Sequence, residues 1–188
     1  MNSSFIILYF GFFYKGKGIP TLFKAIKILK ENNQDFVLVM VGEIRSINED
    51  YVNYLKRLQK ELDIQDKILW TGGLKEQDVS LFIKSSDIVV LPFDEGISLR
   101  RGSLIACIVH GKCIISTFHK FTPSLFKDGI NIVLIPPKDH YTLVSKIEYL
   151  LKNQDKIEFI ENNVRELSGM FTWRKIASLY EKVFKRLL

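Results

Sequence analysis

The chain has 188 residues, of which 47% are hydrophobic and 26% charged, and its formal net charge is +6. This length allows one domain with a large buried core, and the composition excludes a chain that is disordered throughout. The lysines are spread along the sequence instead of forming one basic block. A solvated, lysine-rich surface explains them better than a nucleic-acid-binding protein, which we expect to show a basic stripe and a recognisable motif.

Targeting and metal-binding signals are missing from the sequence. Residues 1–10 lack the basic start and the small-residue cleavage site of a signal peptide, and no apolar stretch reaches the roughly 18 to 20 residues that span a bilayer. We therefore expect a cytoplasmic protein. Cys107 and Cys113 lie in apolar runs and are expected to be reduced core thiols. The three histidines have no metal-ligand spacing, so we expect no metal and no other cofactor.

Short apolar runs alternate with helical patterns along the chain. The runs predicted as strands are 5–10, 36–41, 67–70, 88–91, 113–116 and 132–135. Helices are predicted over 19–32, 48–62, 76–85, 104–109, 141–153, 156–168 and 172–187. This alternation predicts an α/β fold, with a Rossmann-like, doubly wound parallel sheet of about six strands and helices on both faces. We expect a single domain over residues 1–188, in which 156–188 form a helical C-terminal tail.

The segment of residues 92–104 combines several chemically useful side chains between a buried strand and a buried helix. It carries one carboxylate, two hydroxyls and two guanidiniums, on Glu95, Ser98, Ser103, Arg100 and Arg101. Ligands bind at the carboxyl ends of parallel strands, and a helix N-terminus attracts anions. The combination predicts an anion-binding site. Taken singly, Ser98 is better explained as a helix cap and the two arginines as solvated surface residues.

Two glycine-containing loops follow other predicted strands. Residues 11–18 place glycines and lysines between a strand and a helix, which suits a phosphate, but their spacing is neither that of a P-loop nor Gly-x-Gly-x-x-Gly. Gly72 and Gly73 follow the third predicted strand. They either let a flat ligand approach the backbone closely or simply form a tight turn.

The order of these motifs resembles the C-terminal, donor-binding half of a GT-B glycosyltransferase of family 4, also called group 1. The resemblance covers nearly the whole chain. Its markers are Gly11 with Lys17-Gly18, Val41-Gly42-Glu43, Thr71-Gly72, Asp87, Leu91-Pro92, Glu95-Gly96, His110-Gly111, residues 128–131, residues 136–139 and residues 171–173.

The resemblance implies a domain that binds a nucleotide-diphosphate sugar for retaining, metal-independent glycosyl transfer in polysaccharide or glycoconjugate synthesis. Lys17 would lie beside the donor diphosphate, Glu95 would be the catalytic residue that holds sugar hydroxyls, and the segment from Thr71 to Leu74 would contact the base. The backbone amides from Gly96 to Leu99 would meet the phosphates. The implied donor-binding residues are Gly11, Lys17, Gly18, Gly72, Gly73, Leu74, Gly96, Ile97, Ser98, Leu99, Arg100, Arg101 and Ser103.

Two positions depart from the family's usual pattern. Phe12 stands where the family commonly has an arginine, and Ser103 stands where it has a second glutamate, which receives the ribose hydroxyls. Ser103 is expected to offer only a weaker, single-hydroxyl contact. Arg100 and Arg101 match a subgroup pattern, Gly-x-Ser-x-Arg-Arg-x-Ser, and are expected to supply the positive charge that Phe12 does not.

The resemblance also bears on partners. A GT-B enzyme has two Rossmann-like domains, and this sequence begins at the first strand of the second one, so we expect the acceptor-binding half to be missing. The chain is then a fragment, one subunit of an enzyme with a separate acceptor-domain subunit, or a degenerate, non-catalytic partner subunit. Any membrane association is expected to be peripheral and through the missing half. No nucleic acid is expected as a partner, and a basic nucleic-acid-binding module is the remote alternative.

Overall fold

A single six-stranded parallel sheet forms the centre of the computed structural model, which describes residues 4–187. The strand order is β3-β2-β1-β4-β5-β6, the order of a Rossmann sheet, and every pairing is parallel. The strands are β1 (Phe5–Phe10), β2 (Phe36–Val41), β3 (Ile68–Gly72), β4 (Ile88–Leu91), β5 (Ile114–Thr117) and β6 (Val133–Ile135). The predicted α/β fold class is therefore confirmed.

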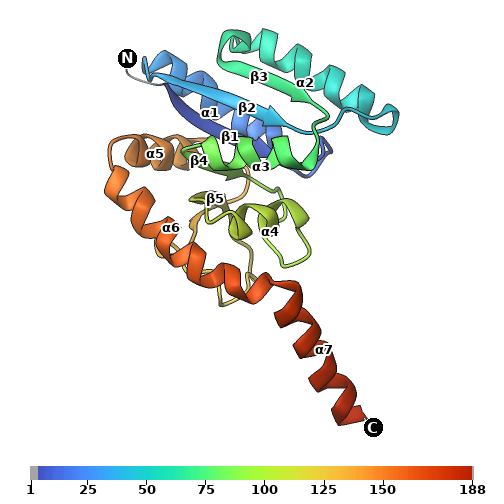
Figure 1. The fold of residues 1–188 in the computed structure, drawn as a ribbon. Helices are drawn as coiled ribbons and strands as arrows, with labels where there is room; N and C mark the ends of the chain where they lie inside the picture. The colour runs from blue at the N-terminus through green and yellow to red at the C-terminus, as the bar shows by residue number, and fades with distance from the viewer. Residues whose placement is uncertain (1–3, 188) are drawn as a thin grey trace.

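Helices cover both faces of this sheet (Figure 1). They are α1 (Ile19–Glu31), α2 (Glu49–Glu61), α3 (Glu76–Ser85), α4 (Gly102–Val109), α5 (His140–Leu151), α6 (Gln154–Ser168) and α7 (Trp173–Leu187), with short 3₁₀ turns at Ser46–Asn48, Gln65–Lys67 and Gly169–Phe171. On one face α1 packs against α2 and α5, and on the other α4 packs against α6. Because both faces are covered, β4 and β5 are buried at every residue, including the polar Ser116 and Thr117 at the end of β5.

Most element boundaries agree with the predicted ones to within two residues, and β3 differs in an informative way. Of residues 71–74, expected to turn the chain after the third strand, Thr71 and Gly72 are instead the last two residues of β3. A register shift between Met40 and Val41 lets Val41 pair with Gly72, which carries the strand past the predicted end at Trp70. Such pairing depends on the neighbouring strand, so local turn preference did not reveal it.

The two C-terminal helices behave differently. α6 buries Ile157, Ile160, Val164 and Leu167, and its Glu161 Oε1 lies 2.6 Å from Lys112 Nζ, with both side chains only 11–12% exposed. α7 instead extends away from the sheet (Figure 1), and its Trp173 is 85% exposed. Within residues 4–187, no helix combines the length and the apolar character that crossing a membrane requires. Residues 1–3, part of the segment 1–10 that is expected not to be a signal peptide, and residue 188, the last of the predicted tail, lie outside the described residues.

The loop after β1 is pressed against the loop after β4. Gly18, which precedes α1, has φ +70°, and a Cβ placed there would lie 1.6 Å from the Pro92 carbonyl oxygen. The Asp94 N–H also donates a hydrogen bond to the Gly16 carbonyl oxygen at 3.0 Å. Only glycine allows this approach, because it has neither a Cβ nor a steric penalty at positive φ.

We predict that Gly18→Ala destabilises the chain much more than Gly72→Ala. Both glycines have φ near +70°, so each alanine adds about 1 kcal/mol of backbone strain. Gly72 has open space where its Cβ would point, whereas at Gly18 the backbone of Pro92 must move, at a further cost of about 2 kcal/mol or more. Denaturant unfolding of the two variants measures the difference. Equal losses of stability would show that the two loops are not held in contact.

Candidate functional site

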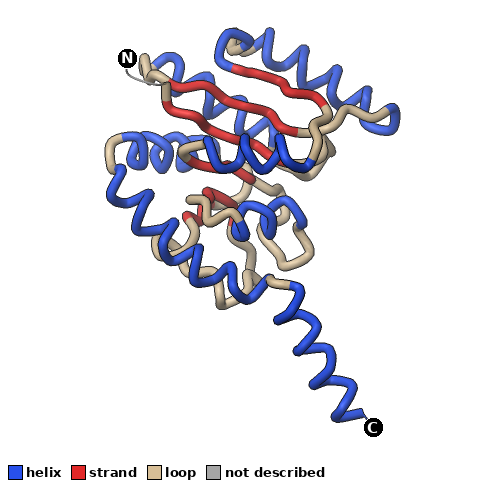
Figure 2. The backbone as a smooth tube through the Cα atoms, viewed as in Figure 1, coloured by secondary structure: helices blue, strands red, loops and turns tan. Residues whose placement is uncertain are grey.

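The candidate site lies where the chain leaves the sheet in opposite directions. β1 is paired with β2 on one side and with β4 on the other, and the chain continues from β1 to α1 on one face and from β4 to α4 on the opposite face. The loops at the carboxyl ends of these central strands (Figure 2) are therefore the topological switch point of the fold. Open α/β sheets bind ligands at such a point.

Two cations share one aromatic ring at this switch point. Phe93 is fully buried, and the Lys17 Nζ lies 5.3 Å from its ring centroid while the Arg101 Cζ lies 4.7 Å from it. Lys17 makes no ion pair with any described residue, and Arg101 makes only a 3.5 Å contact, from Nη2 to Glu95 Oε2. Cation–π contact holds each positive side chain in place without neutralising its charge.

The electrostatics of this pair favour an incoming anion. Burial, and then the neighbouring Arg101, hold the pKa of Lys17 below the usual value of 10.5. Both causes disfavour the charged amine, and a bound anion beside the two cations would raise the pKa of Lys17 again and so offset them. The described residues therefore leave positive charge at this site that an anionic ligand could balance.

The structure separates the two neighbouring arginines. Arg101 has only a quarter of its side chain exposed and reaches back to Phe93. Arg100 is exposed and makes no ion pair or aromatic contact with any residue of 4–187. Of the two arginines, only Arg101 lies with Lys17 on Phe93. The sequence alone could not distinguish Arg101 from Arg100, because the two are adjacent.

A cleft of about 850 Å³ opens beside these residues. Five predicted donor-binding residues line it: Gly11, Lys17, Gly73, Leu74 and Ser103. Its other lining residues are Phe10, Phe12, Val41, Gly42, Glu43, Arg45, Lys75, Glu76, Val79, Gly102 and Ala106. The remaining predicted residues do not line it: Gly18, Gly72, Glu95, Gly96, Ile97, Ser98, Leu99, Arg100 and Arg101. The structure thus gathers residues from four of the six strand ends around one cleft.

The backbone amides after β4 divide into two pairs. The Gly96 N–H donates to the Phe93 carbonyl oxygen at 3.2 Å and the Ile97 N–H donates to the Thr117 carbonyl oxygen at 2.9 Å. Those two amides hold the loop together and are not available to phosphates in this conformation. The amides of Ser98 and Leu99 have no partner within the described chain, so they are the two predicted amides that remain open to a ligand.

The start of α4 also differs from the predicted one. The helix begins at Gly102, with Arg101 as its N-cap and no side-chain cap. Ser98 is therefore not the cap, and its carbonyl oxygen accepts a hydrogen bond from the Arg101 N–H at 3.2 Å. Ser103 lies in the first turn, where a Cβ on Gly11 would be 3.4 Å from the Ser103 Cβ. The position expected to hold a second glutamate thus contacts the end of β1 in the cleft.

Sequence reasoning missed Arg45. This residue lies four positions after the end of β2, and its Cζ is 4.8 Å from the ring centroid of Phe12. Its Nε donates to Glu43 Oε2 at 2.6 Å, and its backbone N–H donates to Asn48 Oδ1 at 2.8 Å. Phe12 is the residue that replaces the expected arginine, and a different arginine from the next loop stacks on it. The sequence did contain a signal for this residue, because Arg45 is the first cation after the Val41-Gly42-Glu43 motif.

The chain matches the family described as "Glycosyl transferases group 1" over residues 2–167. It is 25% identical, over 186 residues, to an uncharacterized glycosyltransferase of Methanocaldococcus jannaschii, covering 97% of this chain and 45% of that protein. The chain thus spans about half the length of the curated relatives that it matches over nearly all of its own length.

Two solved structures show the same fold. One is the C-terminal domain of the group 1 glycosyl transferase LpcC from Francisella tularensis, with a TM-score of 0.74 and 23% identity, covering 92% of this chain and 87% of that one. The other is HepE from Anabaena in complex with UDP and glucose, with a TM-score of 0.83 and 17% identity, covering 98% of this chain and 48% of that one. With the Rossmann strand order and the cleft at its switch point, these matches show that the chain belongs to the group 1 glycosyl transferases and has the fold of the C-terminal half of their GT-B architecture.

Proposed function

We propose that the chain is the donor-binding half of a retaining glycosyltransferase, which takes its sugar from a nucleotide diphosphate. The observation that carries this proposal is the pair of cations on Phe93, Lys17 and Arg101, next to the cleft at the switch point. The complex of HepE with UDP and glucose supports the choice of ligand, because that protein has the same fold.

The chemistry follows from where charge develops. When the bond between the sugar and the diphosphate breaks, negative charge grows on the departing phosphate, and fixed cations and N–H groups lower the barrier. Lys17 and Arg101 would supply the cations, and the amides of Ser98 and Leu99 would supply the N–H groups. We therefore propose a reaction that needs no metal. Glu95, exposed and 3.5 Å from Arg101, would hold hydroxyls of the sugar. Gly73 and Leu74, in the cleft wall, would contact the base.

A second Rossmann-like domain, on the same polypeptide or on a partner, would complete the active site in this proposal. The product would be a polysaccharide or glycoconjugate. A cytoplasmic location agrees with the two cysteines, which are buried and unpaired, and burial raises the pKa of both thiols to about 12. Such thiols persist in a reducing compartment.

One observation favours a second candidate, a non-catalytic subunit with the same fold. Ser103 lines the cleft at the position where a glutamate is expected, and a single hydroxyl holds a ribose less firmly than a carboxylate does. That candidate predicts a folded chain that binds no nucleotide sugar. Calorimetric titration of the purified chain with UDP, GDP and their sugar conjugates separates the two: saturable binding of one nucleotide supports the enzyme half, and its absence in the assembled two-domain protein supports the non-catalytic subunit.

We predict that Lys17→Met and Arg101→Met each weaken nucleotide binding by about tenfold or more, because each removes a charge-assisted contact worth about 1.5–3 kcal/mol. Arg100→Met is the matched control, since it removes the same charge one residue away, and should change affinity by less than about twofold. Calorimetry on the three variants provides the comparison. An equal loss from Arg100→Met would mean that general attraction, not the Phe93 pair, binds the nucleotide.

The lowered pKa of Lys17 predicts a pH dependence. Binding requires the charged amine, so affinity should fall as the pH rises through this pKa, which lies below the value of 10.5 for an ordinary lysine. In Arg101→Met one of the two lowering causes is gone, so the pKa rises and the loss of affinity should move to higher pH. Nucleotide titrations in a pH series measure both midpoints. An unchanged midpoint in Arg101→Met would contradict the coupling of the two cations.

We also propose that Arg45 contributes a cation to the donor cleft, and predict that Arg45→Met weakens nucleotide binding by about threefold to tenfold. Glu43→Gln should strengthen it, because the guanidinium loses its carboxylate partner at 2.6 Å. Lys67→Met is the control, since Lys67 also lies over a phenylalanine ring, that of Phe36, but at the amino end of the strands. If Arg45→Met behaves like Lys67→Met, Arg45 has no part in the site.

A further inference from the structure

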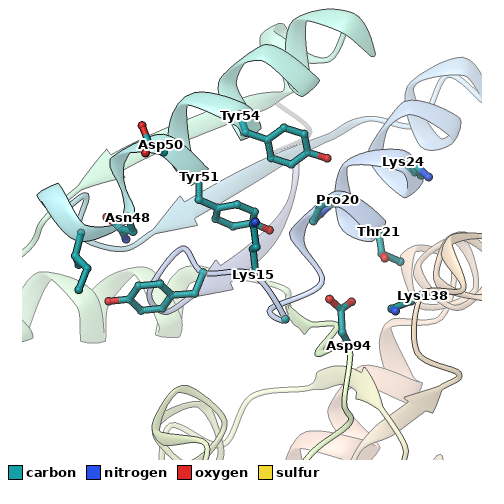
Figure 3. A pocket seen from close by; sticks show the side chains of 13 residues that line it. Lys15, Pro20, Thr21, Lys24, Asn48, Asp50, Tyr51, Tyr54, Asp94 and Lys138 are labelled. Atoms are coloured by element: carbon teal, nitrogen blue, oxygen red, sulfur yellow. The ribbon is translucent and has the colours of Figure 1, made fainter.

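A second hollow, of about 1000 Å³, lies on the other side of the paired loops 11–18 and 92–97. We call it the tyrosine–lysine groove. Its walls are Tyr51 and Tyr54 of α2, Pro20 and Thr21 of α1, Lys15 of the first loop and Lys138 before α5 (Figure 3). It shares no lining residue with the donor cleft. Lys15 faces the groove and Lys17 faces the cleft, so the first loop supplies one cation to each hollow.

One buried polar group on the groove wall, the side-chain amide of Asn48, has an unsatisfied donor. Asn48 is 3% exposed, and while its Oδ1 accepts the Arg45 N–H, its Nδ2 has no hydrogen bond. Thr21 is 8% exposed and adds a hydroxyl to the same wall. Both residues line the groove (Figure 3). Buried donors are almost always satisfied in native proteins, so the unsatisfied Asn48 Nδ2 at this hollow indicates a polar ligand.

The charged side chains of the groove are also unpaired. Neither Lys15 nor Lys138 lies within 4.0 Å of a carboxylate oxygen in the described part of the chain. Figure 3 shows the Lys15 side chain reaching up beside Tyr51, and the Asp94 carboxylate on the side of the groove where Lys138 ends. The acids of the groove are Asp94 and Asp50. This arrangement suits a ligand with one anionic group near the lysines and hydroxyls that bind the carboxylates.

The two tyrosines add a flat surface. Their ring centroids are 5.8 Å apart with an interplanar angle of 29°, and Tyr54 is 40% exposed. Rings with a hydroxyl at the edge pack against the apolar face of a sugar and still donate hydrogen bonds. Burial, then Tyr54 and Asp94, raise the pKa of Tyr51 to about 12, which keeps its phenol protonated as a donor.

We propose that the tyrosine–lysine groove binds a saccharide that bears a phosphate or carboxylate group, and that this saccharide is the acceptor side of the transfer. The proposal rests on the proposed donor function. Asp94 lines the groove and the next residue, Glu95, contacts Arg101 on the donor side, so a saccharide in the groove lies close to the donor sugar. The Tyr51–Tyr54 surface accounts for a sugar ring, and Lys15 with Lys138 accounts for its anionic group.

The test is a titration of the ¹⁵N-labelled chain with glucose 6-phosphate, followed by amide chemical shifts, first alone and then with UDP at saturation. Glucose and inorganic phosphate are titrated separately as probes that lack one half of the ligand. We expect glucose 6-phosphate to shift the amides of Lys15, Tyr51 and Lys138 and to bind at least about tenfold more tightly than either control probe. UDP should instead shift the amides around Lys17 and Leu74.

Two variants keep the test independent of folding. Lys138 has φ +62°, a conformation that glycine adopts without strain, so Lys138→Gly removes the amine without lowering stability. It should weaken glucose 6-phosphate binding about fivefold or more and leave UDP binding unchanged. Lys84→Met, which removes an exposed lysine on α3, is the matched control and should affect neither ligand.

Each outcome decides the proposal. Shifts confined to the donor cleft, equal affinity for glucose 6-phosphate and inorganic phosphate, or equal effects of Lys138→Gly and Lys84→Met would overturn it while UDP binding remained intact. Binding of glucose 6-phosphate in the groove without any UDP binding would overturn the acceptor role together with the proposed donor function. Shifts in the groove that persist in the presence of UDP, with binding that Lys138→Gly weakens and Lys84→Met does not, would support it.

Discussion

The close approach of Gly18 to the Pro92 carbonyl oxygen is the constraint on which the arrangement of this site depends. It is possible because β1 and β4 are adjacent in the sheet, with Ile7 opposite Ile88. At the other end of the same two strands, the Asp87 carboxylate accepts the Ile6 N–H at 2.6 Å and the Asp87 N–H donates to the Ile6 carbonyl oxygen at 2.9 Å. With the two strands tied at both ends, the loops after them have little freedom. They form a ridge with the 850 Å³ cleft on one side and the tyrosine–lysine groove on the other.

Three cations in or beside the 850 Å³ cleft lie on aromatic rings, and of these only Arg45 also has a close carboxylate partner, Glu43 at 2.6 Å. Lys17 and Arg101 lie on Phe93, and Arg45 lies on Phe12. Away from the cleft the chemistry is different: Lys112 is paired with Glu161 at 2.6 Å in a nearly buried contact that joins α6 to the start of β5. A buried ion pair satisfies its own charges, and breaking it is costly. Lys17 and Arg101, held on the Phe93 ring, keep N–H donors available for an anionic ligand.

Local patterns of the sequence were sufficient for the fold. Continuous apolar runs such as 36–41 belong to strands covered on both faces, and the 3, 4, 7 spacing of Leu22, Ala25, Ile26 and Leu29 gives α1 its buried side. These patterns depend on residues near each other in the chain, so each element could be recognised by itself. The end of β3 could not, because Gly72 is in the strand only through its pairing with Val41 on the neighbouring strand.

The sequence by itself determined the α/β class, the Rossmann-like sheet, the family resemblance and the loops that carry the site. Only the tertiary structure decided which members of those loops act together. Arg100 and Arg101 are consecutive, but one faces solvent and the other Phe93, and Arg45 comes from a loop that the sequence did not connect with Phe12. The physical reason is that charge, burial and cation–π contact depend on distances between segments far apart in the chain, and the parallel sheet sets those distances when it brings the strand ends to one edge.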